Sequence, residues 1–135
     1  MGRFSEHVVI VTGGAKGIGQ GISLAFAEAG ACVVCADVDD AAGEEVAASG
    51  EAMEGSIDFR SGDVSKDAVC SDLVGYATEE YGGVHVLCNN VGIQPTDSYQ
   101  RLHEVTDDAW DRILDVNLKS FFLVSRVCIP HMLSA

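Results

Sequence analysis

Short, unbroken apolar runs alternate along the chain with longer stretches in which apolar residues recur every three or four positions. The runs predict strands buried on both faces of a sheet, and the periodic stretches predict helices with one buried face. The expected strands are residues 8–11, 32–36, 56–60 and 84–88, and the expected helices are 18–29, 39–48, 65–81 and 107–133. This alternation predicts an α/β fold built from parallel units with right-handed crossovers.

The last expected helix follows a loop over residues 92–106 and carries apolar side chains on two of its sides. Thr106 is the expected N-cap of this helix, and the two aspartates that follow it suit the positive end of the helix dipole. Pro130 lies near its end and is expected to kink it. A helix that is apolar on two sides needs partners on both, so we expect a homo-oligomer formed through residues 107–133.

A glycine-rich run, Thr12-Gly13-Gly14-Ala15-Lys16-Gly17-Ile18-Gly19, joins the first strand to the first helix. Gly13 permits a tight turn, Gly17 lets the backbone approach a pyrophosphate, and Gly19 allows close packing of the helix. The free N–H groups of the helix N-terminus favour an anion there. The turn predicts a Rossmann-type, doubly wound parallel sheet that binds a dinucleotide, with Lys16 and Ile18 also at the site.

Asp37 follows the second expected strand, 18 positions after Gly19. An acidic residue about 20 positions past the glycines holds the adenosine ribose of a dinucleotide and repels a 2′-phosphate, so we expect NAD as the cofactor. Lys16 is a counter-signal, because a cation in this turn can serve a 2′-phosphate. The alternative interpretation is that the glycines merely form a turn and Asp37 is a solvated strand end.

Three further motifs occur in order: Asp63-Val64, Asn89-Asn90-Val91-Gly92 and Asp115-Val116-Asn117. Together with the glycine turn, they make the chain resemble the short-chain dehydrogenase/reductase family from about residue 8 to residue 133. The resemblance implies strand order 3-2-1-4 and hydride transfer between NAD and a secondary alcohol or ketone. It also implies that Asp63 and Val64 contact the adenine, that the turn holding Asn89 and Gly92 lies at the cofactor, and that Asn117 is catalytic.

Each of these polar residues also has a structural interpretation. Asp63 and Asn89 stand where strands end, which is where ligands bind in open α/β sheets, but either could cap a helix or form an Asx-turn. Asn117 lies on an apolar helix face, so its amide needs hydrogen-bond partners, in a catalytic water relay or in the structure alone. Val91 departs from the family's Ala, and its larger side chain could crowd the ribose or repack against the sheet.

The family's acid–base residues are absent from the chain. The resemblance implies a Tyr as general acid/base, a Lys four positions later and a Ser that orients the substrate. The lysines are at 16, 66 and 119 and the tyrosines at 76, 81 and 99, so no Tyr has a Lys at that spacing. The resemblance places the missing residues on a fifth strand and the next helix. We therefore expect residues 1–135 to form a single, incomplete NAD-binding domain, truncated before strand five.

Two functions remain open at this point. The chain is the cofactor-binding half of an NAD-dependent oxidoreductase, or it is a non-catalytic, truncated module that binds a nucleotide or another subunit. A Rossmann-type methyltransferase is less favoured, because it would have an acidic first turn in place of Thr12-Gly13-Gly14.

Composition narrows the class of partners. The chain has 21 acidic residues against 8 lysines and arginines, a net charge of -13 that repels phosphate backbones and anionic lipids. No apolar run reaches the roughly 18–20 residues needed to span a bilayer. We expect a small alcohol or ketone substrate for the full-length parent, no nucleic-acid or membrane partner, and a cytoplasmic location.

The spacing of the five cysteines matches no disulfide framework, which is typical of reduced thiols. Cys32 and Cys35 form a C-x-x-C motif, but residues three apart on a strand point to opposite faces, so buried thiols are expected. Neither His103 nor His131 has a second ligand at a metal-binding spacing, so we expect no metal site.

Overall fold

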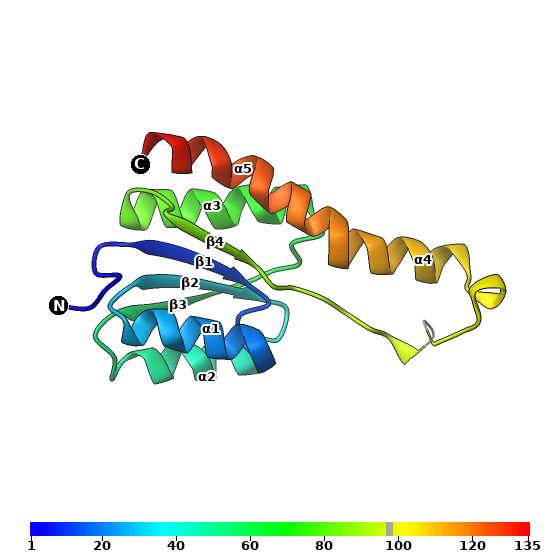
Figure 1. The fold of residues 1–135 in the computed structure, drawn as a ribbon, viewed down its shortest axis with the longest axis horizontal. Helices are drawn as coiled ribbons and strands as arrows, with labels where there is room; N and C mark the ends of the chain where they lie inside the picture. The colour runs from blue at the N-terminus through cyan, green and yellow to red at the C-terminus, as the bar shows by residue number, and fades with distance from the viewer. Residues whose placement is uncertain (97–98) are drawn as a thin grey trace.

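The computed structural model describes residues 1–96 and 99–135. At its centre is a parallel sheet with strand order β3-β2-β1-β4 (Figure 1). The strands are β1 (Val8–Thr12), β2 (Cys32–Asp37), β3 (Ser56–Ser61) and β4 (Val86–Asn89). The α/β fold class and the strand order expected for a Rossmann-type sheet are therefore confirmed.

Helices cover both faces of the sheet (Figure 1). On one face lie α1 (Gly17–Glu28) and α2 (Asp40–Gly50), and on the other lie α3 (Asp67–Tyr81) and α5 (Ser120–Ser134). Successive β1 side chains enter the two cores in turn, so the whole strand is buried. This double burial explains why its sequence is an unbroken apolar run.

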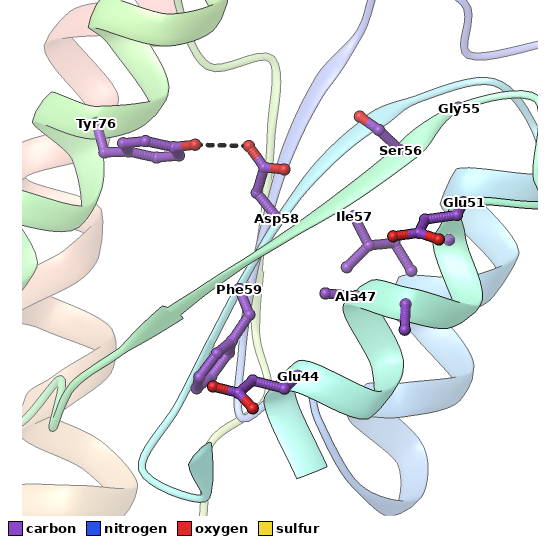
Figure 2. A pocket seen from close by; sticks show the side chains of 11 residues that line it. Glu44, Ala47, Glu51, Gly55, Ser56, Ile57, Asp58, Phe59 and Tyr76 are labelled. Carbon is purple, nitrogen blue, oxygen red and sulfur yellow. Dashed lines mark hydrogen bonds between the residues drawn. The ribbon is translucent and has the colours of Figure 1, made fainter. Parts of the chain in front are cut away.

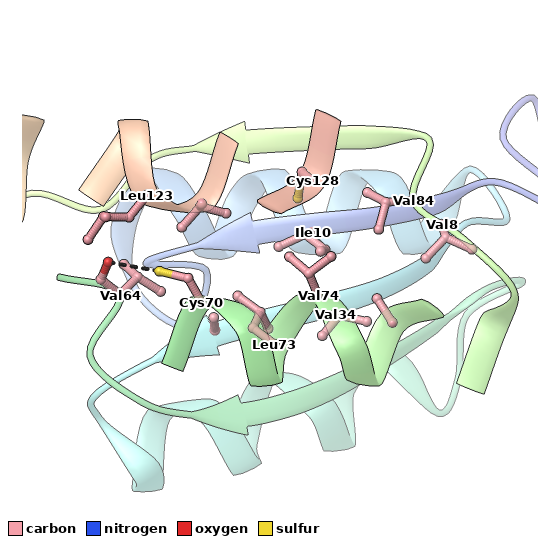
Figure 3. Close-up of a cluster of buried hydrophobic side chains, with 13 residues drawn as sticks. Val8, Ile10, Val34, Val64, Cys70, Leu73, Val74, Val84, Leu123 and Cys128 are labelled. Atoms are coloured by element: carbon pink, nitrogen blue, oxygen red, sulfur yellow. Dashed lines mark hydrogen bonds between the residues drawn. The ribbon is translucent and has the colours of Figure 1, made fainter. Parts of the chain in front are cut away.

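Figure 3 shows the core on the α3 and α5 face. Ile10 and Val34 of the sheet meet Leu73 and Val74 of α3 and Leu123 of α5, and none of these side chains is more than 4% exposed. Burial of one such side chain stabilises the fold by roughly 1.5–3 kcal/mol. This packing fixes the positions of the strand ends, where the candidate site lies.

The expected helix 107–133 is not a uniform α-helix. It consists of α4 (Asp107–Leu114), the π-helical turn η3 (Asp115–Lys119) and α5, and it follows the 3-10 turn η2 (Leu102–Glu104). The expected N-cap is confirmed, because the Thr106 hydroxyl accepts the Ala109 N–H at 3.2 Å. Pro130 lies inside α5. Helix α4 projects past the carboxyl ends of the strands (Figure 1).

Two elements begin two positions later than the sequence predicts. Helix α3 begins at Asp67 instead of residue 65, because Asp63 and Ser65 form a hydrogen-bonded turn before it. Strand β4 begins at Val86 instead of residue 84, although the His85 N–H still donates to the Val8 carbonyl at 2.9 Å.

Candidate cofactor-binding site

The glycine turn has the backbone that its sequence predicts. Gly13 has a φ of 62° and Gly17 a φ of 55°, in the left-handed region that favours glycine. A Cβ added at Gly19 would lie 1.9 Å from the Gly13 carbonyl oxygen, so helix α1 packs directly against the turn. The position of Gly19 therefore leaves no room for a side chain, and those of Gly13 and Gly17 favour glycine through their φ.

The turn leaves an open space in front of the α1 N-terminus. A Cβ at Gly17 would meet nothing within 4 Å, and the N-cap residue Lys16 makes no side-chain capping bond. Ile18, in the first turn of α1, is 79% exposed. Free N–H groups, the positive end of the helix dipole and a bare glycine suit a phosphate group. The turn therefore fits the pyrophosphate of a dinucleotide.

Polar side chains tie this turn to its neighbours. Asn90 Nδ2 donates to the Gly13 carbonyl at 3.0 Å, and the Asn90 N–H donates to Thr12 Oγ1 at 3.1 Å. Ser23 Oγ donates to the Gly14 carbonyl at 2.9 Å. Sequence reasoning missed Asn90 and Ser23 as supports of the site. The sequence offered a signal only for Asn90, which is the second Asn of the Asn89-Asn90 pair.

Asp37 lies beside the glycine turn at the end of β2. Its Oδ2 accepts the Ala15 N–H at 3.2 Å and its Oδ1 accepts the Asp39 N–H at 3.0 Å. Two backbone donors therefore hold the carboxylate in place. Its position fits the role expected of a residue that binds the adenosine ribose.

A pocket of about 220 Å³ opens next to Asp37 at the carboxyl ends of the strands. It brings together residues from the glycine turn, the ends of β2 and β3, the segment after β4, and α4 with η3. The lining residues are Gly13, Ala36, Asp37, Val38, Gly62, Asp63, Val64, Val91, Ile93, Arg112 and Val116. Arg112 and Val116 were not expected there, because their place depends on how α4 and η3 pack.

Lys16, the counter-signal for a 2′-phosphate, is engaged in an ion pair. Its Nζ lies 3.0 Å from Asp39 Oδ2. The hydrogen bond to Asp39 and its negative charge raise the pKa of Lys16. The pKa of Asp39 is lowered, first by the Ala42 N–H that it accepts and then by Lys16.

Asp63 and Asn89 make the local contacts of their structural interpretations. Asp63 Oδ1 accepts the Ser65 N–H at 2.9 Å and the Ser65 hydroxyl at 2.7 Å, which forms an Asx-turn, while the residue also lines the pocket. Asn89 Nδ2 donates to Ser125 Oγ at 3.1 Å. Within the described residues, the buried Asn89 Oδ1 has no hydrogen-bond partner. A ligand contact at either residue stays a prediction.

The Asn117 amide makes two hydrogen bonds to the backbone of one residue, Ile93. Its Oδ1 accepts the Ile93 N–H at 2.6 Å, and its Nδ2 donates to the Ile93 carbonyl at 2.8 Å. Asn117 lies in the π-helical turn η3, and Gly92 lies next to it, because a Cβ there would be 3.7 Å from Asn117 Oδ1. Asn117 therefore fixes the segment after β4 at the site, and its catalytic role stays a prediction.

A larger groove of about 790 Å³ runs along the edge strand β3, with α2 on one side and Tyr76 of α3 on the other (Figure 2). Asp58 Oδ2 accepts the hydroxyls of Tyr76, at 2.6 Å, and Tyr81, at 2.5 Å. The hydrogen bond from Tyr76 to Asp58, together with partial burial, raises the pKa of Tyr76 to about 12. The groove includes Gly55 and Ser56, at the start of β3, and so lies away from the carboxyl ends of the strands. The smaller pocket, at the carboxyl ends of the strands, is therefore the candidate cofactor site.

The five cysteines are free thiols. Burial raises the pKa of Cys35 and of Cys128 to about 12 and that of Cys70 to about 11, so these thiols are protonated near neutral pH.

Among the residues that the structure describes, no group of three or more His, Cys, Asp or Glu side chains could hold a metal ion. In the same part of the chain, no helix is long and apolar enough to cross a membrane.

The sheet, its helical layers and the glycine turn define a Rossmann-like α/β domain. A family model described as short chain dehydrogenase matches residues 7–135. The chain therefore belongs to the short-chain dehydrogenase/reductase family of oxidoreductases.

Characterised and uncharacterised relatives agree with this assignment. An uncharacterized oxidoreductase of Thermotoga maritima is 35% identical over 96% of this chain and 50% of the relative. A 3beta-hydroxysteroid dehydrogenase of Mediterraneibacter gnavus is 35% identical over 93% of this chain and 45% of the relative. A D-beta-hydroxybutyrate dehydrogenase of Cupriavidus necator is 34% identical over 91% of this chain and 46% of the relative. The chain thus spans about half the length of the curated relatives it matches.

Proposed function

We propose that the protein is an NAD-dependent oxidoreductase that transfers a hydride between NAD and a secondary alcohol or ketone. Residues 1–135 form its cofactor-binding half. The Asp37 carboxylate carries this proposal, because it is held by two backbone N–H groups beside the glycine turn and the small pocket. The names of two relatives, a hydroxysteroid and a hydroxybutyrate dehydrogenase, support a substrate that bears a hydroxyl group.

Each part of the site has a proposed role in holding the cofactor. The open space before Gly17, with the N–H groups of the α1 N-terminus, accepts the pyrophosphate. The pocket walls at Asp63 and Val64 accept the adenine, and the turn that holds Asn89 and Gly92 contacts the rest of the cofactor. When bound, NAD supplies the site that accepts or donates the hydride.

We propose that Asn117 is a positioning residue, which acts through the backbone segment that it holds. By fixing both polar groups of the Ile93 backbone, it sets the path of the segment that leaves β4 along the cofactor site. We propose that this rigid segment bounds the space in which substrate and cofactor meet, since small errors in placement cost much of the rate.

The preference for NAD over NADP follows from charge. The Asp37 carboxylate can accept hydrogen bonds from the two ribose hydroxyls of NAD, whereas it repels the 2′-phosphate of NADP. Two like charges about 4 Å apart repel by roughly 1 kcal/mol in water and by about 4 kcal/mol near a protein surface. Asp37 is partly buried, so the repulsion lies between these limits.

The test is calorimetric titration of the full natural chain with NAD and NADP, for the wild type and for Asp37→Ala. We expect the wild type to bind NAD at least tenfold more tightly, since tenfold corresponds to about 1.4 kcal/mol. Asp37→Ala should bring the two affinities together. Equal affinities in the wild type would refute the cofactor assignment, and no binding of either nucleotide would favour a module that acts on another subunit.

We also propose a homo-oligomer, built on the apolar stripe along η3 and α5. Leu118, Phe122, Ile129 and Leu133 are each at least 50% exposed and are spaced by four, seven and four positions, which puts them on one helix side. Exposed apolar side chains on one helix side mark an interaction site, and a two-fold dimer would pair this stripe with its own copy.

A cytoplasmic location completes the proposal. All five cysteines are unpaired in the structure, as is usual for proteins of a reducing compartment. A labelled full natural chain in cell fractions would test the location.

A further inference from the structure

The ion pair between Lys16 and Asp39 joins the glycine turn to the start of α2. Lys16 Nζ lies 3.0 Å from Asp39 Oδ2, and Lys16 is the only cation in the glycine-rich run 12–19. The pair stands beside Asp37, whose Oδ1 accepts the Asp39 N–H. The cation that could serve a 2′-phosphate is therefore already neutralised by a carboxylate.

Asp39 is fixed in this position independently of Lys16. Its second oxygen, Oδ1, accepts the Ala42 N–H at 3.0 Å and caps helix α2. The carboxylate thus uses one oxygen for the helix and the other for the lysine. Because the cap anchors the carboxylate, it holds the flexible Lys16 side chain on the α2 side.

We propose that Asp39 is a second determinant of the preference for NAD, in addition to Asp37. Asp37 repels the 2′-phosphate of NADP, and Asp39 engages the lysine that would otherwise attract it. This inference rests on the proposed function, since it concerns the same dinucleotide site. It predicts that replacement of Asp37 alone converts the preference incompletely.

The experiment isolates the 2′-phosphate with two fragments, 5′-AMP and adenosine 2′,5′-bisphosphate, titrated into the full natural chain together with NAD and NADP. Variants are compared in an Asp37→Ala background, because that removes the direct repulsion. Asp39→Asn keeps the helix cap, since Asn caps as well as Asp, and removes the negative charge and the oxygen that pairs with Lys16. Asp40→Asn is the matched control: it makes the same change in net charge one residue later, where the carboxylate accepts the Ser61 hydroxyl and has no contact with Lys16.

We expect Asp39→Asn to raise the affinity for the bisphosphate and for NADP by about twofold to fivefold over Asp37→Ala alone, the range that one exposed ion pair supplies. Adding Lys16→Met should cancel the gain, and 5′-AMP should not show it. The gain should also shrink at high salt, where exposed charges are screened.

The outcomes separate the two ideas. If NAD still binds but Asp39→Asn equals Asp40→Asn, or if the gain survives Lys16→Met, the role of Asp39 is overturned while the proposed function stands. If the wild type binds neither NAD nor NADP, the proposed function fails and this inference fails with it.

Discussion

Replacement of Gly19 by Ala tests whether helix α1 must touch the glycine turn. The added Cβ would lie 1.9 Å from the Gly13 carbonyl oxygen and 2.5 Å from Asn90 Nδ2. Non-bonded heavy atoms settle at roughly 3.5 Å, so helix and turn must separate by more than about 1 Å. Forced overpacking of this kind costs about 1–3 kcal/mol, and the better helix propensity of Ala returns at most about 1 kcal/mol.

We therefore expect Gly19→Ala to lower the free energy of unfolding by about 1–2 kcal/mol. NAD affinity should fall more than tenfold, because displacement of the turn would move the N–H groups that are proposed to bind the pyrophosphate. Gly21→Ala is the matched control on the same helix: a Cβ there meets nothing within 4 Å. That substitution should stabilise the chain by about 0.4–1 kcal/mol.

Urea denaturation of the two variants and calorimetric titration with NAD measure both effects. The comparison is internal, since both substitutions add one methyl group to one helix. If Gly19→Ala proves as stable as Gly21→Ala and binds NAD with wild-type affinity, close contact between helix and turn is not required and the argument from the glycines fails.

Two further predictions concern the helical region after β4. Asn117→Ala removes two hydrogen bonds to Ile93 and should lower the free energy of unfolding by about 1–2 kcal/mol. Hydrogen exchange at the Ile93 amide should become faster. Unchanged exchange would show that the two hydrogen bonds do not hold this segment. Ile129→Lys places a charge on the exposed stripe of α5 and should weaken self-association at least tenfold in sedimentation velocity. Leu102→Lys, at a more exposed position off the stripe, should not weaken it. Equal behaviour of the two lysine variants would remove the stripe from the interface.

Local patterns in the sequence determined the sheet and the glycine turn. An unbroken apolar run such as residues 8–11 is stable only as a strand buried on both faces, and this burial calls for helices on both sides. Gly13 and Gly17 report on the backbone at their own positions, where positive φ favours a residue without a Cβ. Asp37 could be found because its spacing from the glycines follows from the length of one strand-turn-helix unit.

The polar contacts that shape the site were decided only by the tertiary structure. Asn90 supports Gly13 across 77 positions and Asn117 holds Ile93 across 24, and no periodicity in the chain reports such pairs. The same holds for Lys16 and Asp39, whose charges were visible in the sequence but whose contact depends on where α2 begins. Apolar patterning specifies which face of an element tends to be buried, because the hydrophobic effect acts on each apolar side chain without a specific partner. A hydrogen bond or ion pair instead depends on the positions of two residues that only the packed layers bring together.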